Sequence, residues 1–264
     1  MGILSMLKGK NILYYPGCLS KFVLKPETEN CKKILEKIGI DFIMLPDELC
    51  CGSPVFNAGY EKEGIKLARK NLELFKKHNI GKIITNCPAC YKTFKEYKNI
   101  LQDWKIEVEH VTITILNYLR KKNIKYNIKQ RATYHDPCHL GRHSNIYSEP
   151  REILERLGYE VIEMKNSREN ALCCGGGAGL KANNPELADK IAKKRIEQAR
   201  EVGADKIITT CPLCFAHLEE NSDGFSDLQV LEFSWVVADA LGLKPGKTCV
   251  KEIKQDEKIL EACS

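Results

Sequence analysis

The stretch KIITNCPAC at residues 82–90 occurs a second time, nearly unchanged, as KIITTCPLC at residues 206–214. In both copies a β-branched run of strand type leads directly into Cys-Pro-x-Cys. Upstream of each copy lie an adjacent Cys-Cys followed by Gly and, farther upstream, a lone Cys. The cysteines of the two copies are Cys18, Cys50, Cys51, Cys87 and Cys90, then Cys138, Cys173, Cys174, Cys211 and Cys214. Five thiols that recur at such similar intervals predict a metal-ligand set in each copy.

The duplication extends beyond the cysteines. Residues 33–39 are echoed by residues 152–158, and the offset between copies is 120 residues at the first Cys and 124 at the last motif. Self-similarity at a long period predicts repeated structural units. We therefore expect a first lobe at residues 10–126, a second lobe at residues 127–245 and a C-terminal tail at residues 246–264.

Short strand-type runs alternate with helical patterns in both halves. The expected strands are 11–15, 41–45, 82–86 and 106–111, then 131–135, 160–164, 206–210 and 228–232. The clearest helical patterns are residues 27–38, 60–78 and 113–122, with apolar residues at three- and four-residue steps. This alternation predicts an α/β fold of two tandem Rossmann-like lobes, each with a parallel sheet, related by a pseudo-twofold axis.

Most of the motif cysteines follow closely after an expected strand. Because all strand C-termini of a parallel sheet lie at one edge, five sulfurs of each copy can converge there. Four thiolates satisfy zinc or a cubane [4Fe–4S] cluster, whereas a vicinal pair suits a polynuclear cluster better than one tetrahedral ion. Two Cys₄ zinc sites, or a redox disulfide, are the alternatives. Cys31, Cys249 and Cys263 lie outside both patterns.

The composition is that of a soluble globular chain, with 43% hydrophobic and 29% charged residues. No apolar run approaches the length of a membrane span, and the opening residues lack a secretory signal, so we expect a cytoplasmic protein with reduced thiols. The net charge of +6 is spread along the chain. We therefore expect no nucleic-acid binding.

The cysteine pattern closely resembles the CCG cysteine-rich repeat of heterodisulfide reductase, in its B-type and D-type subunits. The same repeat occurs in iron–sulfur subunits of glycolate oxidase and of anaerobic glycerol-3-phosphate dehydrogenase. The resemblance spans residues 12–241 and is strongest over YHDPCHLGRH at 134–143 and RENALCCG at 168–175, which are similar to the C-terminal part of D-type chains. Gly52 agrees with D-type chains, since B-type chains have Pro there.

The resemblance implies a noncubane [4Fe–4S] cluster in each complete repeat, held by its five cysteines; zinc in one lobe stays an alternative. In heterodisulfide reductase such clusters cleave the coenzyme M–coenzyme B disulfide with one electron for each sulfur. D-type chains carry a ferredoxin-like segment that is not found in these 264 residues. The expected partners are therefore a separate ferredoxin-like or flavoprotein electron donor and a small-molecule disulfide. A membrane subunit would take part only through such a partner.

Several polar residues near Cys138 and Cys174 are candidates for the reaction. His139 is the candidate general acid for a departing thiolate, whereas hydrogen bonding to cluster and loop is the plainer role for the histidines. The candidate substrate-binding residues are His135, Arg142, His143 and Lys181. The glycine-rich run at 175–179 predicts close backbone approach to a cluster rather than phosphate binding. The alternative function is an electron-transfer subunit of a flavin-dependent 2-hydroxy-acid or glycerol-3-phosphate dehydrogenase.

Overall fold

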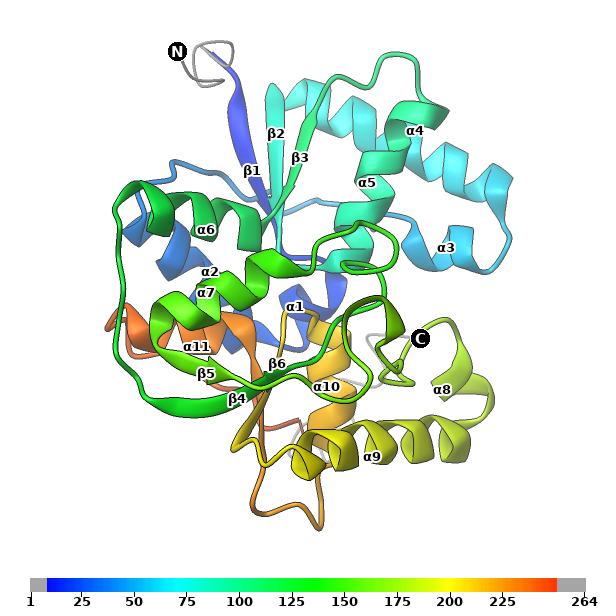
Figure 1. Cartoon of the computed structure of the whole chain (residues 1–264). Helices are drawn as coiled ribbons and strands as arrows, with labels where there is room; N and C mark the ends of the chain where they lie inside the picture. The colour runs from blue at the N-terminus through cyan, green and yellow to red at the C-terminus, as the bar shows by residue number, and fades with distance from the viewer. Residues whose placement is uncertain (1–8, 251–264) are drawn as a thin grey trace.

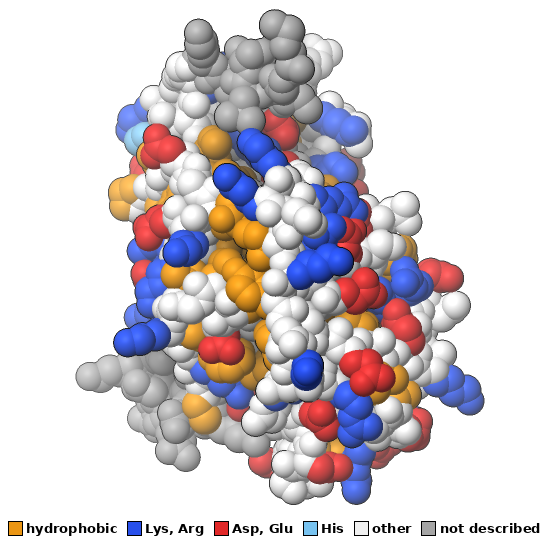
Figure 2. All heavy atoms as spheres, turned by 60° about the vertical axis from the view of Figure 1, so that its left-hand side comes forward, with side chains coloured by type: hydrophobic (Ala, Val, Ile, Leu, Met, Phe, Trp, Pro, Cys, Tyr) orange, Lys and Arg blue, Asp and Glu red, His pale blue; other side chains and the backbone are white. Residues whose placement is uncertain are grey.

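The computed structural model describes residues 9–250. The opening residues, Cys263 and most of the tail expected at 246–264 lie outside this range. Within residues 9–250, none of the helices combines the length and the apolar character that crossing a membrane requires. On the face in Figure 2, hydrophobic side chains gather in a strip, and Lys and Arg are interspersed with Asp and Glu around it.

The first half of the chain forms a three-stranded parallel sheet in the order β1-β2-β3. Its elements are β1 (Asn11–Tyr15), α1 (Cys18–Phe22), α2 (Lys25–Lys37), α3 (Ser53–Asn57), α4 (Glu61–Lys77), β2 (Ile80–Thr85), α5 (Pro88–Ile100), β3 (Glu107–His110) and α6 (Val111–Lys121).

The second half forms a four-stranded parallel sheet in the order β5-β4-β6-β7. Its elements are β4 (Gln130–Tyr134), α7 (Ser148–Leu157), β5 (Tyr159–Val161), the 3₁₀ helix η2 (Arg168–Asn170), α8 (Leu180–Asn183), α9 (Pro185–Glu201), β6 (Lys206–Thr209), α10 (Pro212–Glu220), β7 (Gln229–Glu232) and α11 (Phe233–Ala240). The predicted α/β fold of two Rossmann-like lobes is confirmed.

One expected strand, residues 41–45, is not a full strand. Ile43 alone bridges Leu13, through hydrogen bonds from Ile43 N to Ile12 O (2.8 Å) and from Tyr14 N to Ile43 O (2.9 Å). Pro46 follows almost at once and has no N–H, so the ladder cannot continue toward Cys50. The segment still occupies the edge position beside β1 that β5 takes beside β4, so the two lobes share one strand order.

The two lobes pack through a central layer of four helices between the two sheets (Figure 1). In it, α2 packs on α11 and α6 packs on α7. Because α2 and α7 follow the first strands of their lobes while α6 and α11 are the last helices, exchanging the lobes exchanges these two contacts. This reciprocal packing is the mark of the predicted pseudo-twofold axis. A continuous apolar core fills the layer, including Ile34, Ile115, Leu154 and Val236.

Two buried side chains cap equivalent helices of this layer. His110 accepts a hydrogen bond from Thr112 N at the start of α6, and Glu232 accepts one from Ser234 N at 2.6 Å at the start of α11. Burial lowers the pKa of His110 to about 3 and raises the pKa of Glu232 to about 8. The two caps therefore favour neutral forms with opposite dependence on pH.

Replacing Glu232 by Gln should remove a pH dependence of stability. The native carboxyl binds its proton more tightly than the unfolded one, so the free energy of unfolding should fall as pH rises from about 4.5 toward about 8 and then level off. The slope for one such group is at most about 1.4 kcal/mol per pH unit. Urea unfolding of the metal-free protein at several pH values measures it. An unchanged slope in Glu232→Gln, with His110 intact, would contradict this assignment.

Candidate metal centres

The motif cysteines lie where strands end. Cys18 begins α1 three residues after β1, and Cys138 follows β4 in a turn. Cys87 and Cys211 are the N-cap residues of α5 and α10, directly after β2 and β6. Neither side chain caps its helix, but each backbone N–H donates to the hydroxyl of a threonine two residues earlier, Thr85 or Thr209. The local structure of the two copies is thus the same.

In the first lobe the five sulfurs form a chain of contacts. Cys18 is hydrogen-bonded to Cys50, Cys50 to Cys51, Cys51 to Cys90, and Cys90 to Cys87. Cys18 is the exposed member, while Cys51 and Cys90 are buried. The motif cysteines of both lobes are free thiols in the described chain, with no disulfide among them.

The second lobe repeats this chain in the same order. Cys138 is hydrogen-bonded to Cys173, Cys173 to Cys174, Cys174 to Cys214, and Cys214 to Cys211. The structure thus gathers the ten cysteines named from the sequence into two groups of five, called here centre 1 and centre 2. Their role as metal ligands stays a prediction.

Thiol–thiol hydrogen bonds divide each centre into acidic and weakly acidic members. Bonds from Cys50 and Cys90 lower the pKa of Cys51 to about 5, and bonds from Cys138 and Cys174 lower that of Cys173 strongly. The hydrogen bond to Cys51 raises the pKa of Cys90. A thiolate is the form that binds metal, so each centre has one sulfur ready to bind first.

The loop after each vicinal pair directs backbone N–H groups at the sulfurs. Gly52 N lies 3.4 Å from Cys50 Sγ, and Gly175 N lies 3.4 Å from Cys173 Sγ. A third such contact comes from the next glycine of the run, 3.4 Å from the sulfur of the next cysteine. Gly52 and Gly175 have φ of +82° and +87°, a region that L-residues rarely adopt. The Gly of Cys-Cys-Gly is thus required by the loop conformation, and the glycine-rich run approaches the sulfurs as expected.

Each lobe braces the centre of the other lobe. Helix α1, which begins at Cys18, packs on α10, which carries Cys214, and Leu24 is buried in the second lobe's outer core. Reciprocally, the turn that holds Cys138 buries Leu140 against Tyr91 of α5, the helix that carries Cys90. Both centres therefore lie at the junction between the lobes.

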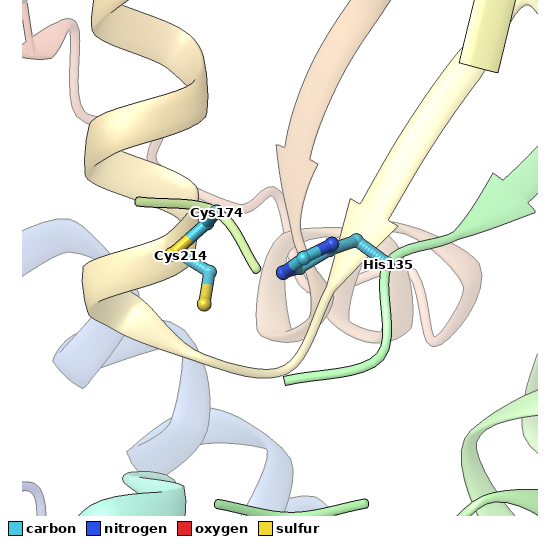
Figure 3. Close-up of side chains that lie close together, drawn as sticks. All are labelled: His135, Cys174 and Cys214. Atoms are coloured by element: carbon cyan, nitrogen blue, oxygen red, sulfur yellow. The ribbon is translucent and has the colours of Figure 1, made fainter. Parts of the chain in front are cut away.

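His135 extends centre 2 beyond its five sulfurs. A ring nitrogen of His135 and the sulfurs of Cys174 and Cys214 lie within 4.8 Å of one another, and Figure 3 shows the imidazole pointing toward the two cysteines. Its Nδ1 accepts a hydrogen bond of 3.0 Å from Arg195 Nε, whereas Nε2 is buried without a hydrogen-bond partner. Burial and the charge of Arg195 lower the pKa of His135 well below its usual value.

Arg195 was not among the residues named from the sequence. It is fully buried, although it lies on the apolar stripe of α9 with Ala192, Ile196 and Ala199. A cation on an otherwise apolar helix face was the available signal.

The remaining candidates lie around Cys138 and α8. His139 Nδ1 is 3.3 Å from Cys138 Sγ, and its ring centroid is 5.1 Å from that of His143. Burial, then His143, lowers the pKa of His139. Arg142 donates to two backbone oxygens, those of residues 169 and 171, which orders the loop before Cys173. Lys181 forms an ion pair with Glu220.

The donor sets fit an iron–sulfur cluster. Each centre supplies five mutually contacting sulfurs, one more than a tetrahedral zinc ion uses. The backbone N–H groups and the unpartnered His135 Nε2 face sulfur atoms, as donors to cluster sulfur do in proteins.

Comparison with known proteins assigns the family. The model of the cysteine-rich domain named CCG matches residues 12–95 and again residues 132–219. The chain belongs to the CCG cysteine-rich domain family. A hypothetical protein from Helicobacter pylori has a similar solved fold, with a TM-score of 0.58 and 15% identity over 91% of this chain and 50% of that one.

Curated relatives of this CCG chain are named as reductase subunits or oxidoreductases. The D-type subunit of dihydromethanophenazine:CoB–CoM heterodisulfide reductase from Methanosarcina acetivorans is 34% identical over 88% of this chain and 59% of its own. The B-type subunit of fumarate reductase (CoM/CoB) from Methanothermobacter marburgensis is 31% identical, over 84% and 45%. EtfAB:quinone oxidoreductase of Syntrophomonas wolfei is 33% identical, over 83% and 34%. The chain spans about three-fifths or less of the length of these relatives.

Alanine at the two equivalent glycines should destabilise the lobes unequally. Positive φ costs an L-residue roughly 1–2 kcal/mol at either site. At Gly175 the added Cβ would also lie 2.6 Å from Ala188 O, whereas at Gly52 it would meet only side chains at 3.4 Å or more. Urea unfolding of the metal-free variants should therefore show a clearly larger loss for Gly175→Ala than for its matched control Gly52→Ala. Equal losses would refute the close packing of this loop on α9.

Proposed function

We propose that this chain is an iron–sulfur subunit of an oxidoreductase and that it reduces a disulfide to two thiols. The heterodisulfide of coenzyme M and coenzyme B is the expected substrate. The observation that carries the proposal is the pair of five-sulfur centres with the same order of contacts, braced against each other at the lobe junction. The reductase and oxidoreductase names of the relatives support it.

Each centre would hold one [4Fe–4S] cluster, expected to be noncubane because five sulfurs are gathered. The ligands would be Cys18, Cys50, Cys51, Cys87 and Cys90 in centre 1, and Cys138, Cys173, Cys174, Cys211 and Cys214 in centre 2. Such a cluster supplies single electrons and an iron with affinity for soft sulfur ligands. Cys51 and Cys173, the most acidic thiols, would bind first.

The protein's own side chains would manage protons and charge. Disulfide reduction consumes two electrons and two protons and leaves two thiols. His139, half-buried beside Cys138 with a lowered pKa, would deliver a proton to one departing sulfur. Exposed Arg142 and His143 would attract an anionic disulfide. Lys181 would do so only by leaving its ion pair, and buried His135 would act on centre 2 alone.

The two electrons would come from a separate ferredoxin-like or flavoprotein subunit. The described residues contain neither a flavin nor a nicotinamide fingerprint, and the relatives named as subunits support a multi-subunit assembly. A membrane subunit would take part through that partner. We expect the chain to act in the cytoplasm and without nucleic acid.

Metal analysis of the anaerobically purified chain tests the centres. About eight irons with matching sulfide are expected, four for each cluster. Cys51→Ala or Cys174→Ala should each remove about half of the iron, whereas Cys249→Ser, a half-buried cysteine outside both centres, should keep all of it. Zinc without sulfide in either centre would refute the iron assignment for that lobe.

Turnover with an artificial reductant tests the reaction. Cys51→Ala and Cys174→Ala should abolish heterodisulfide reduction, and His139→Ala should slow it by about 10²-fold if the imidazole is the general acid. The similarity to EtfAB:quinone oxidoreductase favours a second candidate, an electron-transfer subunit of a flavin-dependent dehydrogenase. Loaded protein that passes electrons to a quinone but leaves the disulfide intact would select that candidate.

A further inference from the structure

Centre 2 has a buried cationic neighbour that centre 1 lacks. Arg195 is fully buried, and its hydrogen bonds reach neutral acceptors: Asn166 O at 2.6 Å, Gln198 Oε1 at 2.9 Å and His135 Nδ1 at 3.0 Å. Its Nη2 is buried without a hydrogen-bond partner. Burial lowers the pKa of Arg195 to about 10, so it stays charged at neutral pH.

The Arg195 bond fixes the tautomer of His135. A guanidinium Nε–H can only donate, so His135 Nδ1 must accept, and the neutral ring carries its proton on Nε2. The imidazole points toward Cys174 and Cys214, with which it forms a group within 4.8 Å (Figure 3). Nε2 is therefore an N–H donor facing the sulfurs, and its lone pair is not free to bind a metal.

The surrounding charges do not cancel this cation. The buried carboxylate Asp136 is held by Arg151 through two hydrogen bonds of 2.7 and 2.9 Å. Glu163 is shared between Arg151 and Arg168. Three arginines thus face two carboxylates in this part of the second lobe.

The equivalent positions of the first lobe are neutral. Tyr15 stands where His135 does, after the matching strand, and its hydroxyl donates to Leu49 O at 2.8 Å. Asn71 of α4 stands where Arg195 does in α9 and donates to Cys50 O at 2.9 Å. The nearby Lys21 is paired with Glu48. Centre 1 thus has no such buried cation in the described chain.

From this contrast we infer that Arg195 and His135 make centre 2 the site of higher reduction potential, so that the first electron entering the chain resides there. A hydrogen bond to cluster sulfur and a nearby positive charge both stabilise the reduced, more negative state. The inference rests on the proposed function, because it requires a cluster in each centre. Arg195 is a positioning residue that acts through His135.

Redox titration of the loaded protein, followed by electron paramagnetic resonance, tests the inference. Cys51→Ala and Cys174→Ala assign the signals to the centres. Arg195→Met and His135→Phe should each lower the higher potential so that electron occupancy of centre 2 falls at least about tenfold, or about 59 mV. Arg195→Lys should recover part of the loss. If Arg195→Met does not fold, His135→Phe, which keeps the ring shape, decides.

Matched variants in the first lobe complete the test. Tyr15→Phe should leave both potentials in place, and the pair Tyr15→His with Asn71→Arg should raise the potential of centre 1. Loaded protein with both potentials unchanged in Arg195→Met and His135→Phe would overturn the inference alone. Loss of iron from centre 2 in His135→Phe would overturn it too, by making His135 a ligand. Wild-type chain without iron would instead refute the proposed function, and the inference with it.

Discussion

The convergence of strand ends is the constraint on which this structure depends. Ten cysteines from Cys18 to Cys214 must meet in two small groups, and the carboxyl edges of two parallel sheets bring them there. The edges alone do not complete the groups. The loop holding each lone Cys packs on a helix of the opposite lobe, α1 on α10 and the Cys138 turn on α5. Each sulfur group is therefore held by the whole molecule.

The fold separates the work of packing from that of chemistry. Apolar side chains fill the central layer and an outer core on each sheet. Charged side chains are buried mainly beside centre 2, where Asp136, Arg151 and Arg195 are tied by hydrogen bonds. Burying such groups is costly unless they are paired, so their place beside the sulfurs indicates a use there rather than in stability.

The sequence allowed the strand and helix order, the strand order within lobes and the grouping of the cysteines to be predicted. These depend on local periodicity and on repetition, which a single chain displays. The edge segment around Ile43 was predicted as a strand because its pattern is β-branched, yet Pro46 limits it to one bridge. The Arg195–His135 contact joins residues 60 positions apart through helix packing, and no local pattern encodes it. The same holds for the bracing of each lobe by the other.

The reciprocal helix contacts of the central layer have an evolutionary consequence. An interface in which the same two patches meet twice is what a symmetric homodimer makes. The chain has the architecture of such a dimer with its two halves joined end to end. In a homodimer every substitution appears in both copies, whereas a joined chain can keep Tyr15 and Asn71 in one half while the other carries His135 and Arg195. Fusion thus permits two ancestral twins to specialise without giving up the surface that pairs them.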